Sequence, residues 1–232
     1  MAVDRTADSP ARVATARHRL LVAVMAIAVA AGALGTASSS SEARGTDSWM
    51  RNCPRGQSAV CVQRVANEMQ QRLDPLADRC DHDAPFALVY LRVTQAIEQA
   101  LRGDTFRHDN YIADMDVLFA DFYFDAYDAW EARRKRDVPP AWRVAFRSAD
   151  RQAVTGLGNI LLGLNAHIRR DLPFVVEELG VRTRDGSSAY PDFRRVNRVL
   201  RPLYPKARDE AAHRFDPTIA DTDLSQTSLD EE

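Results

Sequence analysis

The sequence predicts an all-α protein, a single-domain helical bundle of about six or seven helices preceded by a signal peptide. Apolar residues recur at intervals of three or four through most of residues 58–215, which is the spacing of one face of a helix. No segment shows the alternation or the density of β-branched residues that is typical of strands. Without its terminal segments, the chain has a length that suits one domain with one core.

The N-terminal segment, residues 1–37, has the composition of a signal peptide. Residues 20–34 are uncharged and apolar, follow Arg17-His18-Arg19 and lead into Gly35-Thr36-Ala37. This run is shorter than the roughly 20 residues that a membrane-spanning helix needs. We therefore expect cleavage after Ala37, with Ala43 as a second candidate, and an uncleaved anchor as the alternative. Both place the domain outside the cytoplasmic membrane, secreted or in the cell envelope.

Composition divides the rest into a linker (38–57), a helical domain (58–215) and a disordered acidic tail (216–232). The net charge is −2, so no overall basic field indicates nucleic-acid binding. The expected partner is a small molecule or an envelope component. Contact with a membrane is expected only through an uncleaved N-terminal segment.

Three cysteines, Cys53, Cys61 and Cys80, follow the predicted cut. Disulfides persist outside the cytoplasm, and an odd number permits at most one internal bridge. We favour Cys53 with Cys61, because they flank a short segment at the start of the first helix. The alternative is that some are small buried apolar residues, Cys80 above all.

The helices are expected in short succession. The first begins at Ser58 and ends or kinks at Asp74-Pro75. Pro139-Pro140 breaks the chain, and Pro140 opens a helix at its first turn. Pro173 terminates or kinks a later one. The other expected ranges are 86–101, 109–136, 154–172, 191–203 and 205–215.

The helix expected over 154–172 carries two lines of residues at helical spacing. One line is apolar and large, whereas the second contains glycines at a cost of about 1 kcal/mol each relative to alanine. Small residues there permit close approach of another helix, ending beside His167. The first line is Val154, Leu157, Leu161, Leu164, Ile168 and Leu172, and the second is Gly156, Ile160, Gly163 and His167.

The candidate site centres on His167 and Asp171, which lie four residues apart and so on one helical face. This spacing presents two metal ligands or orients an imidazole with a carboxylate. Asp116 falls on the apolar face of the helix over 109–136, where a carboxylate needs a partner: His167, Asn165 or an arginine. The competing interpretation is an interhelical hydrogen-bond network, or a buried Asp–Arg pair, that serves only the fold.

A metal site is the sharper hypothesis. His82 and His108 each have an acidic neighbour, and convergence with His167 and Asp171 predicts a zinc or manganese site that activates water. Asp116 and Asn165 are then the expected catalytic groups. For Asp83 and Asp109, which precede helices, a capping role is favoured over a role in the metal site.

Several other chemistries find less support. The aspartates 114, 121, 125 and 128 form a stripe that could chelate Mg²⁺, but a solvated face is favoured. The sequence contains no glycine-rich phosphate loop, no Gly-x-Ser-x-Gly elbow and no HExxH pair. Ser187-Ser188 lies in a loop without a nearby base, so nucleophilic serine chemistry is not expected.

Four segments together resemble a bacterial family of α-helical domains of unknown function. They are CDHDA (80–84) with YLRVT (90–94), DVLFA (116–120) with YFDA (123–126), LLGLNAHI (161–168) with DLP (171–173), and PDF (191–193) with Val196-Asn197. The resemblance covers residues 58–204 and implies the helical fold. It singles out Asn165, His167 and Asp171, with Asp116 and Asn197 as lesser candidates. This chain has Arg169 and Arg170 where members often have Asn and Tyr.

Two functional hypotheses follow. The first is an exported metal-dependent hydrolase, with His167, Asp171 and either His108 or His82 as ligands and Asp116 as base or orienting group. The second is a non-enzymatic structural or binding module of the cell envelope, in which the same cluster holds helices together.

Overall fold

The computed structural model describes residue 54 and residues 56–221, and the structural statements below concern these residues. The expected signal peptide, most of the expected linker, Cys53 and residues 222–232 lie outside them, so the Cys53–Cys61 pairing stays a prediction. Cys80 is exposed and carries a free thiol. Across residues 56–221 no helix is both long and apolar enough to cross a membrane.

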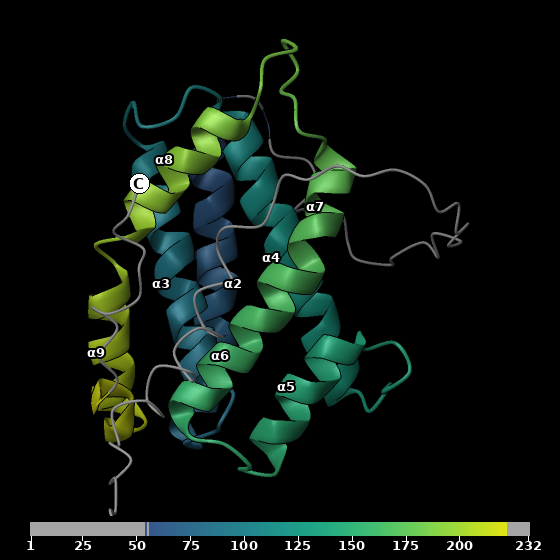
Figure 1. Ribbon diagram of the computed structural model, residues 1–232, viewed down its shortest axis with the longest axis vertical. Helices are drawn as coiled ribbons and strands as arrows, with labels where there is room; N and C mark the ends of the chain where they lie inside the picture. Colours follow the sequence, from purple (N-terminus) through teal and green to yellow (C-terminus); the bar gives the residue numbers. More distant parts are fainter. Residues whose placement is uncertain (1–53, 55, 222–232) are drawn as a thin grey trace, which may run out of the picture. The chain divides into compact units, whose positions relative to one another are not determined.

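The predicted all-α class is confirmed. The described residues contain helices and no strand, apart from an isolated bridge between Arg182 and Ser188. Because α6, η3 and α7 follow one another without a break, these residues form seven helical rods (Figure 1). The elements are α2 (Ser58–Asp78), α3 (Ala84–Leu101), α4 (Asp109–Glu131), α5 (Pro140–Asp150), α6 (Gly156–Ala166), the π-helical turn η3 (His167–Asp171), α7 (Leu172–Leu179), α8 (Tyr190–Leu200), α9 (Tyr204–Arg214) and the 3₁₀ turn η4 (Pro217–Asp221).

Helix α3 is the central element. It packs against α2, α4, α6, α8 and α9, and Figure 1 shows it between α2 and α9 with α6 crossing in front. Its first half, residues 84–91, is buried on every side, as expected of a helix that is apolar all round. Tyr90 and Thr94, one turn apart on α3, therefore place two hydroxyl groups inside the bundle.

Helix α4 buries the face that its spacing predicts, with Asp116 inside that face. The acidic stripe is not uniformly solvated, because Asp121 is also buried. Asp128 is exposed and pairs with Arg72 of α2, and Asp114 lies 3.8 Å from Arg184. The prediction of a solvated stripe is therefore wrong for Asp121.

Close packing of α6 against its neighbours depends on the glycine line. A β-carbon at Gly163 would lie 2.3 Å from Cδ2 of Phe86 on α3, and one at Gly156 would lie 2.8 Å from Cβ of Asp216. All four positions of the glycine line, 156, 160, 163 and 167, are buried, whereas Leu161, which belongs to the line of large apolar residues, is 41% exposed. The small residues mark the buried face, and the predicted close approach is confirmed.

Two helix boundaries and the end of the folded domain differ from the sequence prediction. Helix α2 continues through Pro75 to Asp78. Pro75 has no amide proton to donate to the carbonyl of Gln71, but both residues lie on the exposed face of the helix, where water can bind that carbonyl. Helix α4 ends at Glu131 rather than near residue 136, because Arg133 adopts a left-handed φ of 58°. The fold also extends past residue 215, as Ile219 of η4 is fully buried.

The chain passes Pro173 without stopping. The amide of Leu172 donates to the carbonyl of His167, five residues earlier, so one wider turn joins α6 to α7. A proline donates no hydrogen bond and crowds the carbonyl four residues before it. Inserting a π turn just ahead of Pro173 is the local adjustment, and such turns are frequent at functional sites. The turn runs from His167 to Asp171.

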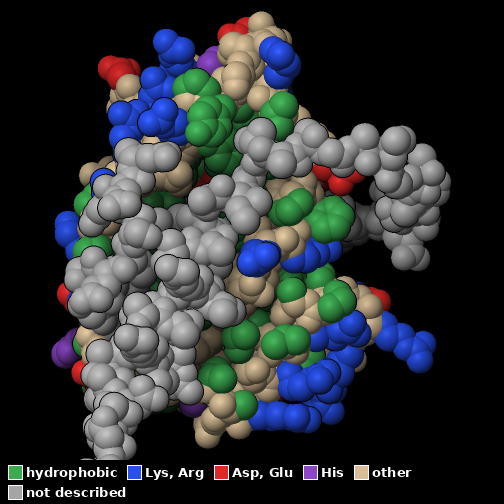
Figure 2. All heavy atoms as spheres, viewed as in Figure 1, with side chains coloured by type: hydrophobic (Ala, Val, Ile, Leu, Met, Phe, Trp, Pro, Cys, Tyr) green, Lys and Arg blue, Asp and Glu red, His purple; other side chains and the backbone are tan. Residues whose placement is uncertain are grey.

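Charged side chains are unevenly distributed over the surface. On the face drawn in Figure 2, Lys and Arg side chains gather near α8 and around α5, with hydrophobic side chains between α5 and α6. Leu161 and Phe174 are the large apolar residues of the α6–α7 rod that are exposed. Basic groups thus form local clusters on a chain whose net charge is −2.

Candidate functional site

Asp171 is the anchor of the site and is completely buried. Its Oδ2 accepts a hydrogen bond from Nε1 of Trp142 at 2.8 Å and lies 3.2 Å from Nδ1 of His167. Its Oδ1 accepts from Nη1 of Arg170 at 2.7 Å. A buried carboxylate is stable only when it is paired and hydrogen-bonded, and these contacts supply both.

Asp171 sets the tautomer of His167. Because its Oδ2 is an acceptor, the proton of the neutral imidazole lies on Nδ1, which leaves the lone pair on Nε2. That Nε2 is buried and has no hydrogen-bond partner within the described part of the chain. Burial lowers the pKa of His167 against the opposing effect of Asp171, so the ring is neutral at pH 7.

Aromatic rings surround the imidazole. The ring of Phe119 stacks on it with centroids 3.5 Å apart and planes 11° from parallel, and the ring of Tyr90 lies at 4.3 Å. Phe86 and Trp142 approach at 6.3 and 6.0 Å. Phe119 is only half-buried, so the imidazole lies one ring away from the surface.

Asp116 belongs to the same region. It lies one turn before Phe119 on α4, and its charge, with that of Asp171, adds to the effect of burial in raising the pKa of Tyr90. Burial alone raises the pKa of Asp116 to about 8, which makes this carboxyl group protonated at pH 7. The arginine partner that the sequence allowed for Asp116 is not found among the residues that the structure describes.

Four buried polar atoms of this region have no hydrogen-bond partner among the described residues. They are the hydroxyl oxygens of Tyr90 and Thr94, Oδ2 of Asp116 and Nε2 of His167. Buried polar atoms are paired in the large majority of cases, so a group of four calls for water or a ligand. We call these four residues the interior cluster.

The other predicted site residues lie elsewhere. Asn165 is exposed on α6, and the lesser candidate Asn197 is exposed on α8. His82 lies before α3, where its Nδ1 is 3.2 Å from Nδ2 of Asn159. His108 lies beyond the other end of α3, a helix of 18 residues and therefore about 27 Å long.

The expected four-residue metal site is therefore not assembled. His82, His108 and His167 take part in three separate networks, because α3 holds the first two at opposite ends. In residues 56–221, no group of three or more His, Cys, Asp or Glu side chains is arranged to hold a metal ion. His167 and Asp171 are brought together, as predicted, but as an oriented imidazole and its carboxylate.

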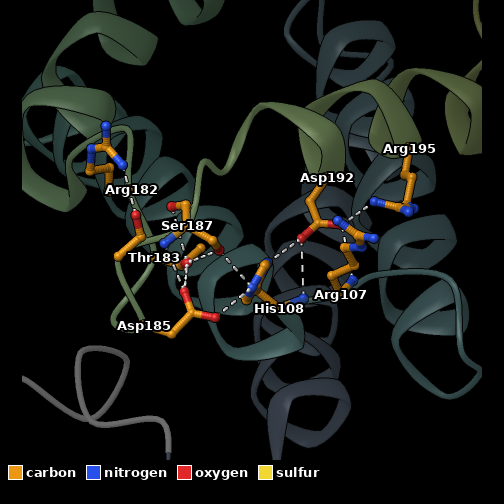
Figure 3. Close-up of polar contacts among 9 residues, drawn as sticks. Arg107, His108, Arg182, Thr183, Asp185, Ser187, Asp192 and Arg195 are labelled. Carbon is orange, nitrogen blue, oxygen red and sulfur yellow. Dashed lines mark hydrogen bonds and ion pairs between the residues drawn. The ribbon is translucent and has the colours of Figure 1, made fainter.

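His108 forms a second polar network with the loop between α7 and α8 (Figure 3). Its Nδ1 lies 2.8 Å from Oδ2 of Asp192, and its Nε2 lies 3.0 Å from Oγ of Ser187 and 3.3 Å from Oδ2 of Asp185. Ser187 therefore has a base beside it, and the expectation that its loop lacks one is wrong. The base comes from a position 79 residues earlier in the chain.

Sequence reasoning also missed Tyr90, Thr94 and Trp142 as members or supports of the site. Tyr90 lies in the first half of α3, which is buried on every side, and Thr94 lies one turn later and is also buried, so a threonine at that position was a usable signal of a buried hydroxyl. The side chain of Trp142 is fully buried. Only its Nε1 contact with Asp171 reveals the polar role, and that depends on how α5 packs beside α6.

Comparison with known proteins defines the family. A family described as "Family of unknown function (DUF5995)" matches residues 62–232, which is most of the chain. The chain belongs to the DUF5995 family. This confirms the resemblance inferred from the sequence to an all-α family of unknown function. No curated protein and no solved structure matches this DUF5995 member significantly.

The residues of the interior cluster come from the segments that carry this family resemblance. Tyr90 and Thr94 belong to YLRVT, Asp116 opens DVLFA, and His167 lies in LLGLNAHI. The four unpartnered atoms of the interior cluster thus fall in one segment of α3 and in two segments, on α4 and on the α6–α7 rod.

Proposed function

We propose that this protein is a hydrolase whose acid and base are Asp116 and His167 of the interior cluster. The observation that carries the proposal is the set of four buried polar atoms without partners, which includes both titratable groups. Active sites are where burial and specific partners displace pKa values and leave polar atoms free for substrate.

The protonation states support an acid–base pair. Burial raises the pKa of Asp116 to about 8 and lowers that of His167, so at pH 7 the carboxyl group holds a proton and the imidazole does not. Groups whose environments displace their pKa values in this way serve as acid and base at neutral pH. The assignment is therefore His167 as base and Asp116 as acid.

Hydrolysis is the reaction that such a pair completes with water alone. Nε2 of His167 takes a proton from water as the oxygen attacks, and Asp116 gives its proton to the departing group. Asp171 stabilises the imidazolium that forms, as its hydrogen bond to Nδ1 already orients the ring. The hydroxyls of Tyr90 and Thr94 are placed to bind polar atoms of the substrate.

The substrate is expected to be small and uncharged where it reacts. The interior cluster is neutral at pH 7, and burying a charge there without a counter-ion costs several kcal/mol. Access to His167 passes Phe119, whose half-buried ring covers one face of the imidazole. We propose that rotation of this side chain admits substrate to the base.

This proposal assigns to protein side chains the role that the sequence-based hypothesis gave to a metal ion. The described residues that were expected to complete the ligand shell, His82 and His108, are held in other networks. Water activation is assigned instead to His167, whose lone pair on Nε2 has no competing donor in the described part of the chain.

The alternative is a non-enzymatic module of the cell envelope, in which the cluster fixes the packing of helices. The enclosure of His167 by four aromatic rings favours this second function. Under it, the same residues contribute stability and the protein turns over nothing.

A panel of chromogenic substrates separates the two. Full-length protein is assayed with p-nitrophenyl glycosides, p-nitrophenyl phosphotriesters and amino-acid p-nitroanilides, all uncharged at the reacting atom, alongside His167→Gln, Asp116→Asn and the exposed control Asn165→Ala. The hydrolase requires turnover that falls at least 100-fold in the first two variants and not in the control. Absence of turnover of all three classes, with lowered melting temperature of His167→Gln, favours the module.

A further inference from the structure

We propose that Ser187, His108 and Asp192 form a second catalytic site, in which Ser187 is the nucleophile for hydrolysis of carboxylic esters. The site lies where the α7–α8 loop and the first turn of α8 meet the start of α4 (Figure 3), and it shares no residue with the interior cluster. The three side chains are in the relation of a catalytic triad, which is recognised by geometry and roles rather than by sequence position.

Asp192 is the fixed member. It is 1% exposed, and its two oxygens accept from the backbone amides of Arg107 and His108 and from Nη1 of Arg195. Burial opposes ionisation, but these hydrogen bonds outweigh it and lower the pKa of Asp192. The carboxylate is therefore ionised and its position is set by α4 and α8 together.

His108 is oriented by that carboxylate. Its Nδ1 lies 2.8 Å from Oδ2 of Asp192, an acceptor, so the proton of the neutral ring is on Nδ1 and the lone pair is on Nε2. The side chain is 21% exposed, so part of the imidazole is accessible to solvent. His108 thus has the tautomer and the access that a general base requires.

Ser187 presents its hydroxyl to this base. Its Oγ lies 3.0 Å from Nε2 of His108, within the range for a serine and its base. It also lies 2.7 Å from Oγ1 of Thr183, whose own hydroxyl donates to Asp185. The half-buried Ser187 is therefore held in place by the loop.

Asp185 has a role once the proton moves. Its Oδ2 lies 3.3 Å from Nε2 of His108, a contact that becomes favourable when His108 is an imidazolium. The hydroxyl of Thr183 and the backbone amide of Ser187 each donate to Oδ1 of Asp185, and these hydrogen bonds lower the pKa of Asp185 and keep it ionised. Two carboxylates, Asp192 and Asp185, thus stabilise the charged form of the base.

The reaction balances with water as the only co-reactant. Oγ of Ser187 attacks the ester carbonyl carbon as its proton passes to Nε2 of His108; the bond to the alcohol oxygen breaks, and that oxygen takes the proton. Water then attacks the acyl carbon, gives a proton to Nε2, and the bond to Oγ breaks as Ser187 regains its proton. The products are a carboxylic acid and an alcohol.

The competing role is structural, because the same contacts hold the α7–α8 loop against α4. The α7–α8 loop is already closed by backbone hydrogen bonds from the amide of Thr183 to the carbonyl of Ser187 and from the amide of Ala189 to the carbonyl of Val181. Side-chain bonds from Thr183 to Asp185 and from Arg182 to the Gly186 carbonyl add to them. Reactivity of Ser187, rather than loop stability, is therefore the decisive measurement.

The experiment uses an alkyl fluorophosphonate probe on full-length protein, with peptide mass mapping. Displacement of fluoride by Oγ attaches the probe to the serine, so the reacting residue is read directly and no variant is required. We expect labelling at Ser187 in the wild type. Labelling is lost in Ser187→Ala, slowed at least tenfold in His108→Gln, and unchanged in Ser188→Ala, whose exposed hydroxyl makes no contact with His108.

A second readout is hydrolysis of p-nitrophenyl acetate, which we expect to fall roughly 100-fold in Ser187→Ala. Lack of probe at Ser187 in the wild type, or an equal rate of labelling in His108→Gln, overturns the proposal. Since the mass shift is mapped to Ser187, failure here leaves the Asp116–His167 hydrolase standing. Conversely, loss of that hydrolase does not alter this outcome.

Discussion

Oδ2 of Asp171 lies 3.2 Å from Nδ1 of His167 across the single π turn of the chain's described part, and neither side chain is exposed by more than a few per cent. The carboxylate of Asp171 therefore determines which nitrogen of the imidazole carries the proton, because both side chains are shielded from water. Any change at Asp171 acts on His167 and on the packing of Trp142 together.

Asp171→Asn is expected to lower the free energy of unfolding by about 3 kcal/mol, because it leaves Arg170 without its buried counter-ion. Urea denaturation followed by circular dichroism measures the loss. Asp128→Asn, which breaks an exposed pair with Arg72, is the matched control and should cost less than about 1 kcal/mol. Equal losses in the two variants contradict the anchoring role of Asp171.

Gly163→Ala should destabilise the fold although alanine favours helices. The added β-carbon would lie 2.3 Å from the ring of Phe86, which is buried among Tyr123, Trp142 and His167 and has little room to move. We expect a loss of roughly 1–3 kcal/mol, as for overpacked cores. Thermal melts should show no comparable loss for Gly103→Ala, where the nearest atom to a new β-carbon is 3.9 Å away.

The fold could be predicted well from the sequence because the apolar periodicity of a helix is contained in a short stretch of residues. Spacing of three or four identified α4 and its buried face, and the glycines at 156 and 163 predicted the close approach of α6. Helix ends were predicted less well where a proline, which usually ends a helix, is tolerated by its surroundings. Pro75 is accommodated within α2 on an exposed face, and Pro173 is accommodated by a π turn.

The site was only half predictable, because its members are distant in sequence. The pair His167 and Asp171 followed from an interval of four, and the buried Asp116 followed from its apolar face. No interval links Trp142 to Asp171 or Ser187 to His108, since these contacts depend on how whole helices pack. For the same reason, three histidines with acidic neighbours did not imply one metal site.

The pH dependence of stability should reveal Asp116. In the folded protein the pKa of Asp116 is raised to about 8 from an ordinary 3.8, so the folded protein holds a proton that the unfolded chain releases. The free energy of unfolding therefore falls as the pH rises towards 8. His167 has a lowered pKa, and its effect is confined to pH values below about 6.5. Between pH 6.5 and 8, stability should fall by roughly 1 kcal/mol per unit.

Asp116→Asn removes this titration, because the amide imitates the neutral acid at every pH. The variant should lack the part of the slope between pH 6.5 and 8 that Asp116 supplies and should exceed the wild type in stability at pH 8. Denaturation at closely spaced pH values measures both, with the exposed Asp78→Asn as a control that keeps the wild-type slope. An unchanged slope in Asp116→Asn contradicts the assignment of a buried proton to this residue.

Phe119→Ala tests whether this ring is what separates His167 from solvent. Removing the stacked, half-buried ring hydrates the imidazole, so the pKa of His167 should rise towards its ordinary value. Histidine side-chain resonances in an NMR titration report that pKa directly, and Tyr190→Ala, which removes an exposed ring from α8, is the control. The variant should also lose about 3 kcal/mol of stability. An unshifted titration in a folded Phe119→Ala protein would show that another group covers the base, and the route proposed for substrate would then be wrong.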